Sequence, residues 1–299
     1  MTDPILLDGG VATELQRGGL SVRDPWWTTR ALLTGQNRRL LQSVHEAYLA
    51  AGARVITVNT FRANLRALRK TTLDGAGQAW MVHAAVGVAA AARNAARVPD
   101  ALIAGSIGPV EDCYRPDLVP SDDELRAEHG WLALQLSRAG ADLFLIETMN
   151  TIREARIAVR EVLAVGGRAW VSFACNDDGT LLSGEPVTGA VHAVQRDGAE
   201  AVLVNCTGPE ATEVALRALC RGRYGLIGAC PNLEDRTGLA AGEHVDRALP
   251  STLEPEQFAE LLARWRADYS LDILGGCCGT TPAHIAAARE VLTEPQLVD

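Results

Sequence analysis

Eight short apolar runs, each followed by a helical pattern, are the feature that most limits what this chain can fold into. The runs are almost continuously apolar, with little alternation of apolar and polar residues. This pattern is typical of strands buried on both faces, as in a parallel sheet. The predicted strands lie at residues 5–7, 55–58, 102–104, 143–146, 170–173, 201–204, 225–227 and 271–274.

Amphipathic segments separate these runs, and we expect each to form a helix. Eight strands alternating with eight helices in 299 residues indicate a single (β/α)8 TIM barrel, with the active site at the C-terminal face of the strands. A doubly wound sheet is the alternative, but no dinucleotide-binding fingerprint opens any unit. No Ser- or Pro-rich linker divides the chain, so we expect one domain over residues 1–299. The predicted helices are 36–51, 77–97, 122–139, 152–165, 187–196, 210–220, 255–268 and 282–293.

Charge and apolar patterning argue against several classes of partner. The formal net charge is −9 and the basic residues are scattered among acidic ones, so we expect no nucleic-acid partner. Lys70 is the only lysine among 28 basic residues, and a Schiff-base mechanism would therefore depend on it. The most membrane-like stretch, residues 84–92, is too short to span a bilayer. The first residues do not resemble a signal peptide, so we expect a cytoplasmic protein.

The strongest chemical signal is the position of the cysteines. Seven cysteines, an odd number, do not suggest a disulfide framework. Five of them stand at the ends of the last four predicted strands, which converge on one rim of a parallel barrel. These five residues are Cys175, Cys206, Cys230, Cys277 and Cys278.

Converging thiolates suit Zn²⁺, and three of them leave a fourth tetrahedral position open, as in a catalytic zinc site. Cys277 and Cys278 can serve one metal only where the strand has ended, and the glycines around them permit that bend. On spacing alone, Cys175 and Cys230 compete with Cys206 as ligands. A cysteine at a strand end is also a common core residue. Cys113 and Cys220 are interpreted as ordinary loop and helix cysteines, and the histidines form no ligand cluster.

Six motifs at the predicted strand ends resemble a known family. They are Asp8-Gly9-Gly10-Val11-Ala12-Thr13-Glu14-Leu15, Asn59-Thr60-Phe61, Gly105-Ser106-Ile107-Gly108-Pro109, Glu147-Thr148, Asn205-Cys206 and Gly275-Gly276-Cys277-Cys278-Gly279-Thr280-Thr281-Pro282. Together they resemble the homocysteine S-methyltransferases, from residue 5 to about 290. The resemblance extends to the homocysteine module of cobalamin-dependent methionine synthase and, more distantly, to betaine–homocysteine methyltransferase.

The resemblance implies a ligand set and a reaction. It implies that Cys206, Cys277 and Cys278 bind zinc, and that Asp8, Gly9 and Glu147 hold the amino-acid end of homocysteine. The zinc would activate the homocysteine thiol for methyl transfer that gives methionine. We favour an onium donor, S-methylmethionine or S-adenosylmethionine, because a barrel that fills 299 residues leaves no room for a corrinoid domain.

Three alternatives stay open at this stage. The barrel could bind homocysteine and act with a separate corrinoid protein, or methylate another thiol or selenol such as selenocysteine. A Schiff-base lyase using Lys70 is the third alternative. We expect a monomer or a homodimer. Trp26 and Trp27 are expected to pack under the first loop instead of covering a ligand.

Overall fold

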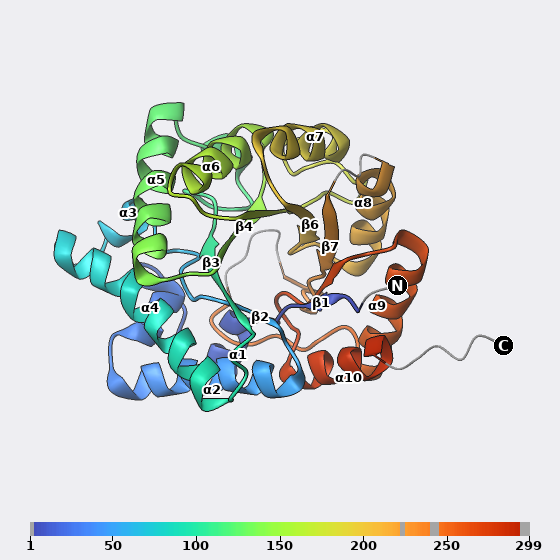
Figure 1. Cartoon of the computed structure of the whole chain (residues 1–299), viewed down its shortest axis with the longest axis horizontal. Coiled ribbons are helices and arrows are strands. Elements are labelled where there is room, and N and C mark those ends of the chain that lie inside the picture. The colour runs from blue at the N-terminus through green and yellow to red at the C-terminus, as the bar shows by residue number, and fades with distance from the viewer. Residues whose placement is uncertain (1–2, 222–224, 240–244, 294–299) are drawn as a thin grey trace.

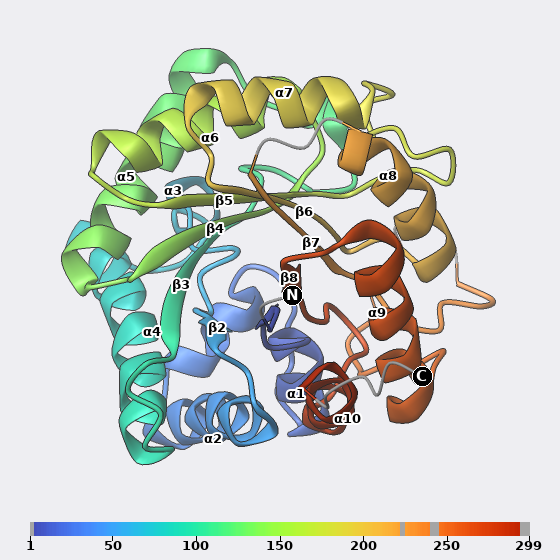
Figure 2. The same cartoon turned by 45° about the vertical axis from the view of Figure 1, so that its right-hand side comes forward.

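The computed structural model describes residues 3–221, 225–239 and 245–293 and confirms the predicted barrel. A ring of strands lies at the centre and helices surround it (Figure 1; Figure 2). All eight predicted strands form, with boundaries that differ by a few residues. They are β1 (Ile5–Leu6), β2 (Val55–Thr57), β3 (Leu102–Ile107), β4 (Leu143–Met149), β5 (Ala169–Phe173), β6 (Ala201–Asn205), β7 (Leu226–Cys230) and β8 (Ile273–Leu274).

Every strand pairs in parallel with its neighbours, in the order β1-β8-β7-β6-β5-β4-β3-β2. The ring closes between β1 and β2, where Leu7 forms a parallel bridge with Val55. Two backbone hydrogen bonds complete this seam: Arg54 N–H donates to the Leu6 carbonyl at 2.7 Å, and Asp8 N–H donates to the Val55 carbonyl at 3.0 Å. The sheet therefore closes on itself.

The eight predicted helices form within one or two residues of the expected bounds, and short helices that the sequence analysis missed precede some of them. The long helices are α2 (Gly35–Ala51), α4 (Gly75–Ala95), α5 (Asp122–Ala139), α6 (Ile152–Ala164), α7 (Val187–Asp197), α8 (Pro209–Arg221), α9 (Pro255–Tyr269) and α10 (Pro282–Thr293). The additional elements are α1 (Val11–Arg17), α3 (Leu65–Leu68) and the 3-10 turns η1 (Trp27–Leu32) and η2 (Pro116–Leu118). Most of them follow β1 or β2, so these two loops are the most elaborate.

Alternation along each strand divides the apolar residues into two cores. In β4, Leu143 and Leu145 point into the barrel, whereas Phe144 and Ile146 pack against the surrounding helices. The barrel interior is filled by side chains, with Trp170 the largest and fully buried. Below the rim the barrel is therefore a packed core rather than a pore.

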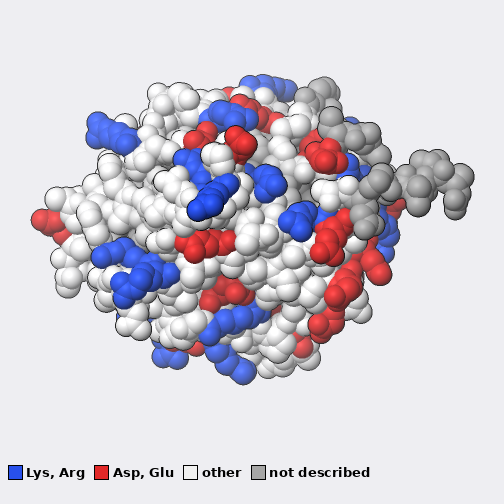
Figure 3. Space-filling model, turned by 60° about the horizontal axis from the view of Figure 1, so that its bottom comes forward, with Lys and Arg blue, Asp and Glu red and all other residues white. Residues whose placement is uncertain are grey.

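The described residues contain no helix with both the length and the apolar character needed to cross a membrane. On the face shown in Figure 3, Lys and Arg side chains are interspersed with Asp and Glu side chains. The two signs of charge are not separated on this face.

Candidate metal and substrate site

Inward-facing strand positions change from apolar to polar at the C-terminal end of the barrel. On β2 to β6, the residue two positions beyond the last apolar interior residue lies on the same face of the strand and is polar. In β4 this residue is Glu147, which follows Leu145. These polar residues line the floor of a cavity of about 300 Å³, and they are Thr57, Ser106, Glu147, Ser172 and Asn205.

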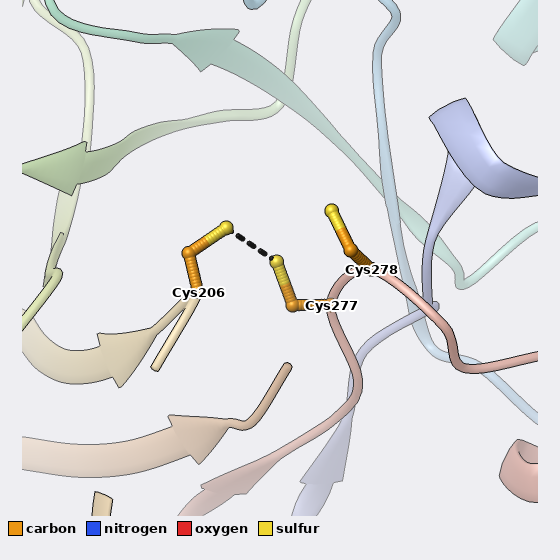
Figure 4. A group of neighbouring side chains, drawn as sticks. All are labelled: Cys206, Cys277 and Cys278. Carbon is orange, nitrogen blue, oxygen red and sulfur yellow. Dashed lines mark hydrogen bonds between the residues drawn. The ribbon is translucent and has the colours of Figure 1, made fainter. Parts of the chain in front are cut away.

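Cys206, Cys277 and Cys278 meet at this cavity, although 71 residues separate the first two. Their sulfur atoms all lie within 4.8 Å of one another, and the Cys206 and Cys277 sulfurs are 2.8 Å apart. Figure 4 shows the three side chains projecting into the same space. All seven cysteines are free thiols.

The backbone conformation directs the three cysteine side chains into the cavity. Cys206 directly follows β6 and has φ of +50°, a left-handed conformation that ends the strand. The segment after β8 is held by backbone hydrogen bonds from Cys277 N–H to Pro231 O (3.1 Å) and from Leu233 N–H to Cys278 O (2.8 Å). Thr280 Oγ1 also donates to Cys277 O at 2.6 Å. Two adjacent cysteines can thus face one cavity because the strand has already ended.

The close approach of the three thiols changes their pKa values. Hydrogen bonds from Cys206 and Cys278 lower the pKa of Cys277 to about 6. The same hydrogen bond to Cys277 raises the pKa of Cys206 above its ordinary value, and burial adds to this shift. One thiolate in the cluster is therefore stabilised by two neighbouring thiols.

The donor set fits a zinc ion. Sulfur atoms that share a tetrahedral zinc at about 2.3 Å lie roughly 3.8 Å apart, and the three sulfurs span separations from 2.8 Å to no more than 4.8 Å. Soft thiolate donors of this kind select zinc over harder cations. Within the described residues, this is the one group of three or more Cys, His, Asp or Glu side chains close enough to share an ion.

The two competing cysteines lie outside the group of three sulfurs, although Cys230 also lines the cavity. Cys230 is the last residue of β7, and its side chain belongs to the apolar barrel interior, where burial raises the pKa of its thiol. Cys175 packs in the core between strands and helices, and burial raises its pKa to about 12. Neither sulfur joins the group of three, so both behave as core thiols.

Asp8 and Glu147 are two acids at the same cavity. Asp8 is 3% exposed and accepts hydrogen bonds from Thr57 N–H (2.7 Å) and Thr57 Oγ1 (2.8 Å). Glu147 accepts a hydrogen bond from Ser106 Oγ. Burial raises the pKa of each carboxyl to about 7, and the charge of Asp8 contributes to the shift at Glu147. A cationic group near the two carboxyls would stabilise their ionised forms and lower both pKa values.

Gly9 and Gly10 bring the backbone close to this site. A Cβ atom at Gly9 would lie 2.9 Å from the Tyr48 hydroxyl oxygen, and one at Gly10 would lie 2.8 Å from Cys277 O. Thr280 Oγ1 accepts a hydrogen bond from Gly10 N–H at 3.1 Å. Only glycine leaves room for this approach, which joins the first loop to the loop that carries Cys277.

Two residues of the strand-end motifs, Thr148 and Asn205, received no role from the sequence analysis. Thr148 has φ of +61°, an unusual conformation for a β-branched residue. Asn205 holds it there, because its Oδ1 accepts from Thr148 N–H at 3.1 Å and its Nδ2 donates to Thr148 Oγ1 at 2.9 Å. Asn205 and Thr148 are the direct neighbours of Cys206 and Glu147, so this clamp joins the two parts of the site.

The cavity wall also differs from expectation. Trp27 lines the cavity, whereas Trp26 packs against the core, so the expectation that both pack under the loop was wrong for Trp27. Cys113, interpreted as an ordinary loop cysteine, lines the wall as well. Lys70, the residue on which a Schiff base would depend, is exposed beyond α3 and does not line the cavity.

Comparison with known proteins shows which family the chain belongs to. The family model described as homocysteine S-methyltransferase matches residues 5–292. The chain belongs to the homocysteine S-methyltransferase family. The six motifs noted above all fall within the matched residues.

Individual relatives in this family carry different names. A homocysteine S-methyltransferase of Escherichia coli is 33% identical, over 96% of this chain and 94% of the relative. A selenocysteine Se-methyltransferase of Brassica oleracea is 27% identical, over 96% and 88%. A methionine synthase of Mycobacterium tuberculosis is 31% identical over 97% of this chain, which spans only 25% of that longer relative.

A solved structure of the homocysteine S-methyltransferase family has the same fold. The crystal structure of the Escherichia coli homocysteine methyltransferase MmuM in its metallated form superposes with a TM-score of 0.82 and 30% identity. The superposition covers 97% of this chain and 96% of that chain. The two chains therefore share one fold over almost their whole length.

Proposed function

We propose that this protein is a zinc-dependent methyltransferase that moves a methyl group from an onium donor to the thiolate of homocysteine, giving methionine. S-methylmethionine and S-adenosylmethionine are the favoured donors. The observation that carries the proposal is the meeting of three sulfurs, the buried Asp8 carboxyl and the half-buried Glu147 carboxyl at one cavity. Membership of the family supports the same conclusion.

In this proposal Cys206, Cys277 and Cys278 hold the zinc. When bound there, zinc supplies Lewis acidity that keeps the homocysteine sulfur deprotonated at neutral pH and leaves it nucleophilic. A free alkyl thiol has a pKa near 8.5 and is mostly protonated under these conditions. The three cysteines are positioned by the ends of β6 and β8, so the barrel fixes where the substrate sulfur sits.

Asp8, Gly9 and Glu147 hold the amino-acid end of homocysteine in this proposal. The two carboxyls lie in a buried region where a substrate ammonium would stabilise their ionised forms. The backbone at Gly9 comes close enough to the cavity to contact the same end of the substrate. This arrangement directs the homocysteine side chain toward the cysteine group.

The methyl transfer is an in-line displacement. The bond between the homocysteine sulfur and the methyl carbon forms as the bond between the methyl carbon and the donor sulfonium sulfur breaks. The donor leaves as a neutral thioether, so no general acid is needed. The proton of the homocysteine thiol is released to solvent before transfer. The task of the protein is to orient the two substrates and exclude water.

A donor screen tests this function. The purified, zinc-loaded protein is incubated with homocysteine and each onium compound in turn, and methionine is followed by mass spectrometry. We expect methionine with a sulfonium donor, about one zinc per chain, and loss of both in Cys277→Ser. Cys175→Ala, which removes a core thiol outside the group, is the matched control and should retain both.

Full activity in zinc-free Cys277→Ser would contradict the proposal. Turnover that appears only after a corrinoid protein is added would favour the alternative suggested by the methionine synthase relative. In that case the barrel binds homocysteine and a separate partner supplies the methyl group.

A selenol acceptor is the second candidate, because one relative is a selenocysteine Se-methyltransferase. A selenol is more acidic than a thiol and needs less activation at the same position. Direct competition between homocysteine and selenocysteine for one donor gives the ratio of their kcat/KM values. A ratio that favours selenocysteine would reassign the acceptor while leaving the site residues in place.

We further propose that residues 1–299 act as one homocysteine-binding domain, as a monomer or homodimer, in the cytoplasm. The seven free thiols support a reducing compartment. Residues 1–2 and 294–299 lie outside the described residues.

A further inference from the structure

Arg62 places a guanidinium group in the wall of the cavity. It lies in the loop between β2 and α3, beyond the strand end. Its Cζ atom is 5.4 Å from the centroid of the Trp27 ring and 5.2 Å from the centroid of the Phe61 ring. Both distances are within the range of cation–π contact, so both rings stabilise the guanidinium at this place.

Both rings are themselves held by the barrel. Asn59 Nδ2 donates to the carbonyl of Thr28, next to Trp27, at 2.8 Å. Phe61 packs on the bare backbone of Gly108, where an added Cβ would lie 2.6 Å from the ring. The Arg62 guanidinium therefore contacts two aromatic rings whose positions are fixed by residues at the strand ends.

The charge of Arg62 is not neutralised by the described residues. Its Nη1 donates to the Glu111 carbonyl oxygen at 2.5 Å, and its Nη2 lies 3.8 Å from Cys113 Sγ. Burial raises the pKa of the Cys113 thiol to about 12, so that contact is with a neutral group. Within the described part of the chain, no carboxylate lies within ion-pair distance of Arg62.

Other arginines near the cavity, unlike Arg62, have carboxylate partners. Arg66, four residues further along the chain, pairs with Glu111 at 2.6 Å and Glu124 at 2.5 Å. Arg236, which also lines the cavity, has Glu234 at 3.5 Å. Arg62 is thus a cavity-lining cation that keeps hydrogen-bond donors for a ligand.

We propose that Arg62 binds the carboxylate of the methyl donor, so that this residue sets the donor's orientation and its preference for a carboxylate. The proposal rests on the proposed function. Homocysteine is assigned to the deep acids Asp8 and Glu147, whereas Arg62 lies on a loop beyond the strand ends. A planar guanidinium is well suited to bidentate carboxylate binding.

Equilibrium binding tests this role independently of turnover. Calorimetry compares S-methyl-L-methionine with its α-carboxamide, which keeps the sulfonium and the ammonium but lacks the negative charge. We expect the wild-type protein to bind the carboxylate form roughly 10- to 100-fold more tightly. Arg62→Gln should lose that preference, and Arg62→Lys should retain part of it. Homocysteine binding should change little in either variant.

Arg115→Gln is the matched control, because Arg115 is an exposed arginine near the same rim that pairs with Asp117 and does not line the cavity. It should bind both probes as the wild type does. Unchanged thermal unfolding and homocysteine binding in Arg62→Gln would establish that the variant folds. In turnover assays with S-methylmethionine, Arg62→Gln should raise the KM for the donor more than it lowers kcat.

Three results would overturn the inference: equal binding of the two probes by the wild type, no detectable binding of either, or an Arg62→Gln defect confined to homocysteine. The proposed function fails by a different result, the absence of methionine with every donor. The two failures are therefore distinguishable.

Discussion

Burial of Asp8 and Glu147 costs stability, and in the proposed function these two residues bind the substrate ammonium. Each carboxyl has a pKa raised by burial to about 7. Between its unfolded value near 4 and about 7, the folded protein binds more protons than the unfolded chain. The free energy of unfolding of the ligand-free protein therefore falls as pH rises through this window. In the proposed function, the same ionisation favours binding of the substrate ammonium.

We predict opposite effects of Glu147→Gln on stability and on binding. Near pH 8 (about one unit above the raised pKa) the variant should unfold at a higher temperature than the wild type, because it buries no charge. Its affinity for methionine should fall roughly 10- to 100-fold, since a charge-assisted hydrogen bond is lost. Methionine is the probe because it has no thiol to titrate.

Thermal unfolding and calorimetry over a range of pH check this prediction. Wild-type affinity for methionine should rise as pH increases through about 7, and the dependence should weaken in Glu147→Gln. Glu200→Gln, a substitution at a surface residue paired with Arg168, is the control. A binding curve independent of pH in the wild type would count against ammonium recognition by these acids.

At the scale of single residues, the sequence indicated a metal site but left its ligands open. Cys175, Cys206 and Cys230 all stand at strand ends, and spacing cannot distinguish them. The structure separates them by side-chain direction: Cys230 faces the barrel interior, whereas the left-handed φ of Cys206 turns its chain at the rim. No sequence pattern predicts a positive φ at a cysteine, so the resemblance to the homocysteine S-methyltransferases was needed to choose Cys206.

At the scale of elements, the ends of β4 and β6 act as one unit. The register of β4 against β5 shifts between Ile146 and Met149, which is where Glu147 and Thr148 lie. Thr148 and Cys206 both have positive φ, and the Asn205 side chain joins the two strand ends. Unusual backbone conformations of this kind persist only where the surroundings hold them.

We predict that Asn205→Ala lowers both stability and substrate affinity. The loss of two buried hydrogen bonds should reduce the free energy of unfolding by about 1–3 kcal/mol. Binding of methionine should weaken too, because Thr148 is adjacent to Glu147. Denaturant unfolding and calorimetry measure the two effects. Asn205→Asp keeps an acceptor for Thr148 N–H, so its stability should fall between those of the wild type and Asn205→Ala. An Asn205→Ala protein with wild-type stability would contradict the role of the clamp.

The strands and long helices were predictable from the sequence, whereas the short helices were not. The strands are continuous apolar runs and the long helices have amphipathic periodicity, so both patterns are visible locally. α1 and α3 are only 7 and 4 residues long and pack against the longer helices α2 and α5. Trp27, Arg62 and Cys113 of the cavity wall come from the loops after β1, β2 and β3, which have no such local pattern.

At the scale of the whole molecule, the cysteine group links elements that are distant in the chain. Cys206 follows β6, and Cys277 and Cys278 follow β8, so a shared ion would tie together two strand ends on either side of β7. A ligand that binds only the folded state raises its stability by mass action.

We predict that chelation lowers the melting temperature of the zinc-loaded wild-type protein. At an ion concentration of about 100 times the dissociation constant, the stabilisation is about 2.7 kcal/mol, equivalent to roughly 5 °C for a chain of this size. Scanning calorimetry with and without a chelator provides the measurement. Cys277→Ser should show little change on chelation, and an equal shift in both proteins would place the ion elsewhere.

The central claim is that Cys206, Cys277 and Cys278 hold a metal with a position left for the substrate sulfur. X-ray absorption at the zinc edge, with and without homocysteine, tests it most directly because it counts the sulfur neighbours of the ion. We predict three sulfur neighbours in the protein alone and four after homocysteine is added. Fewer than three sulfurs at the start, or a count that homocysteine does not change, would contradict it.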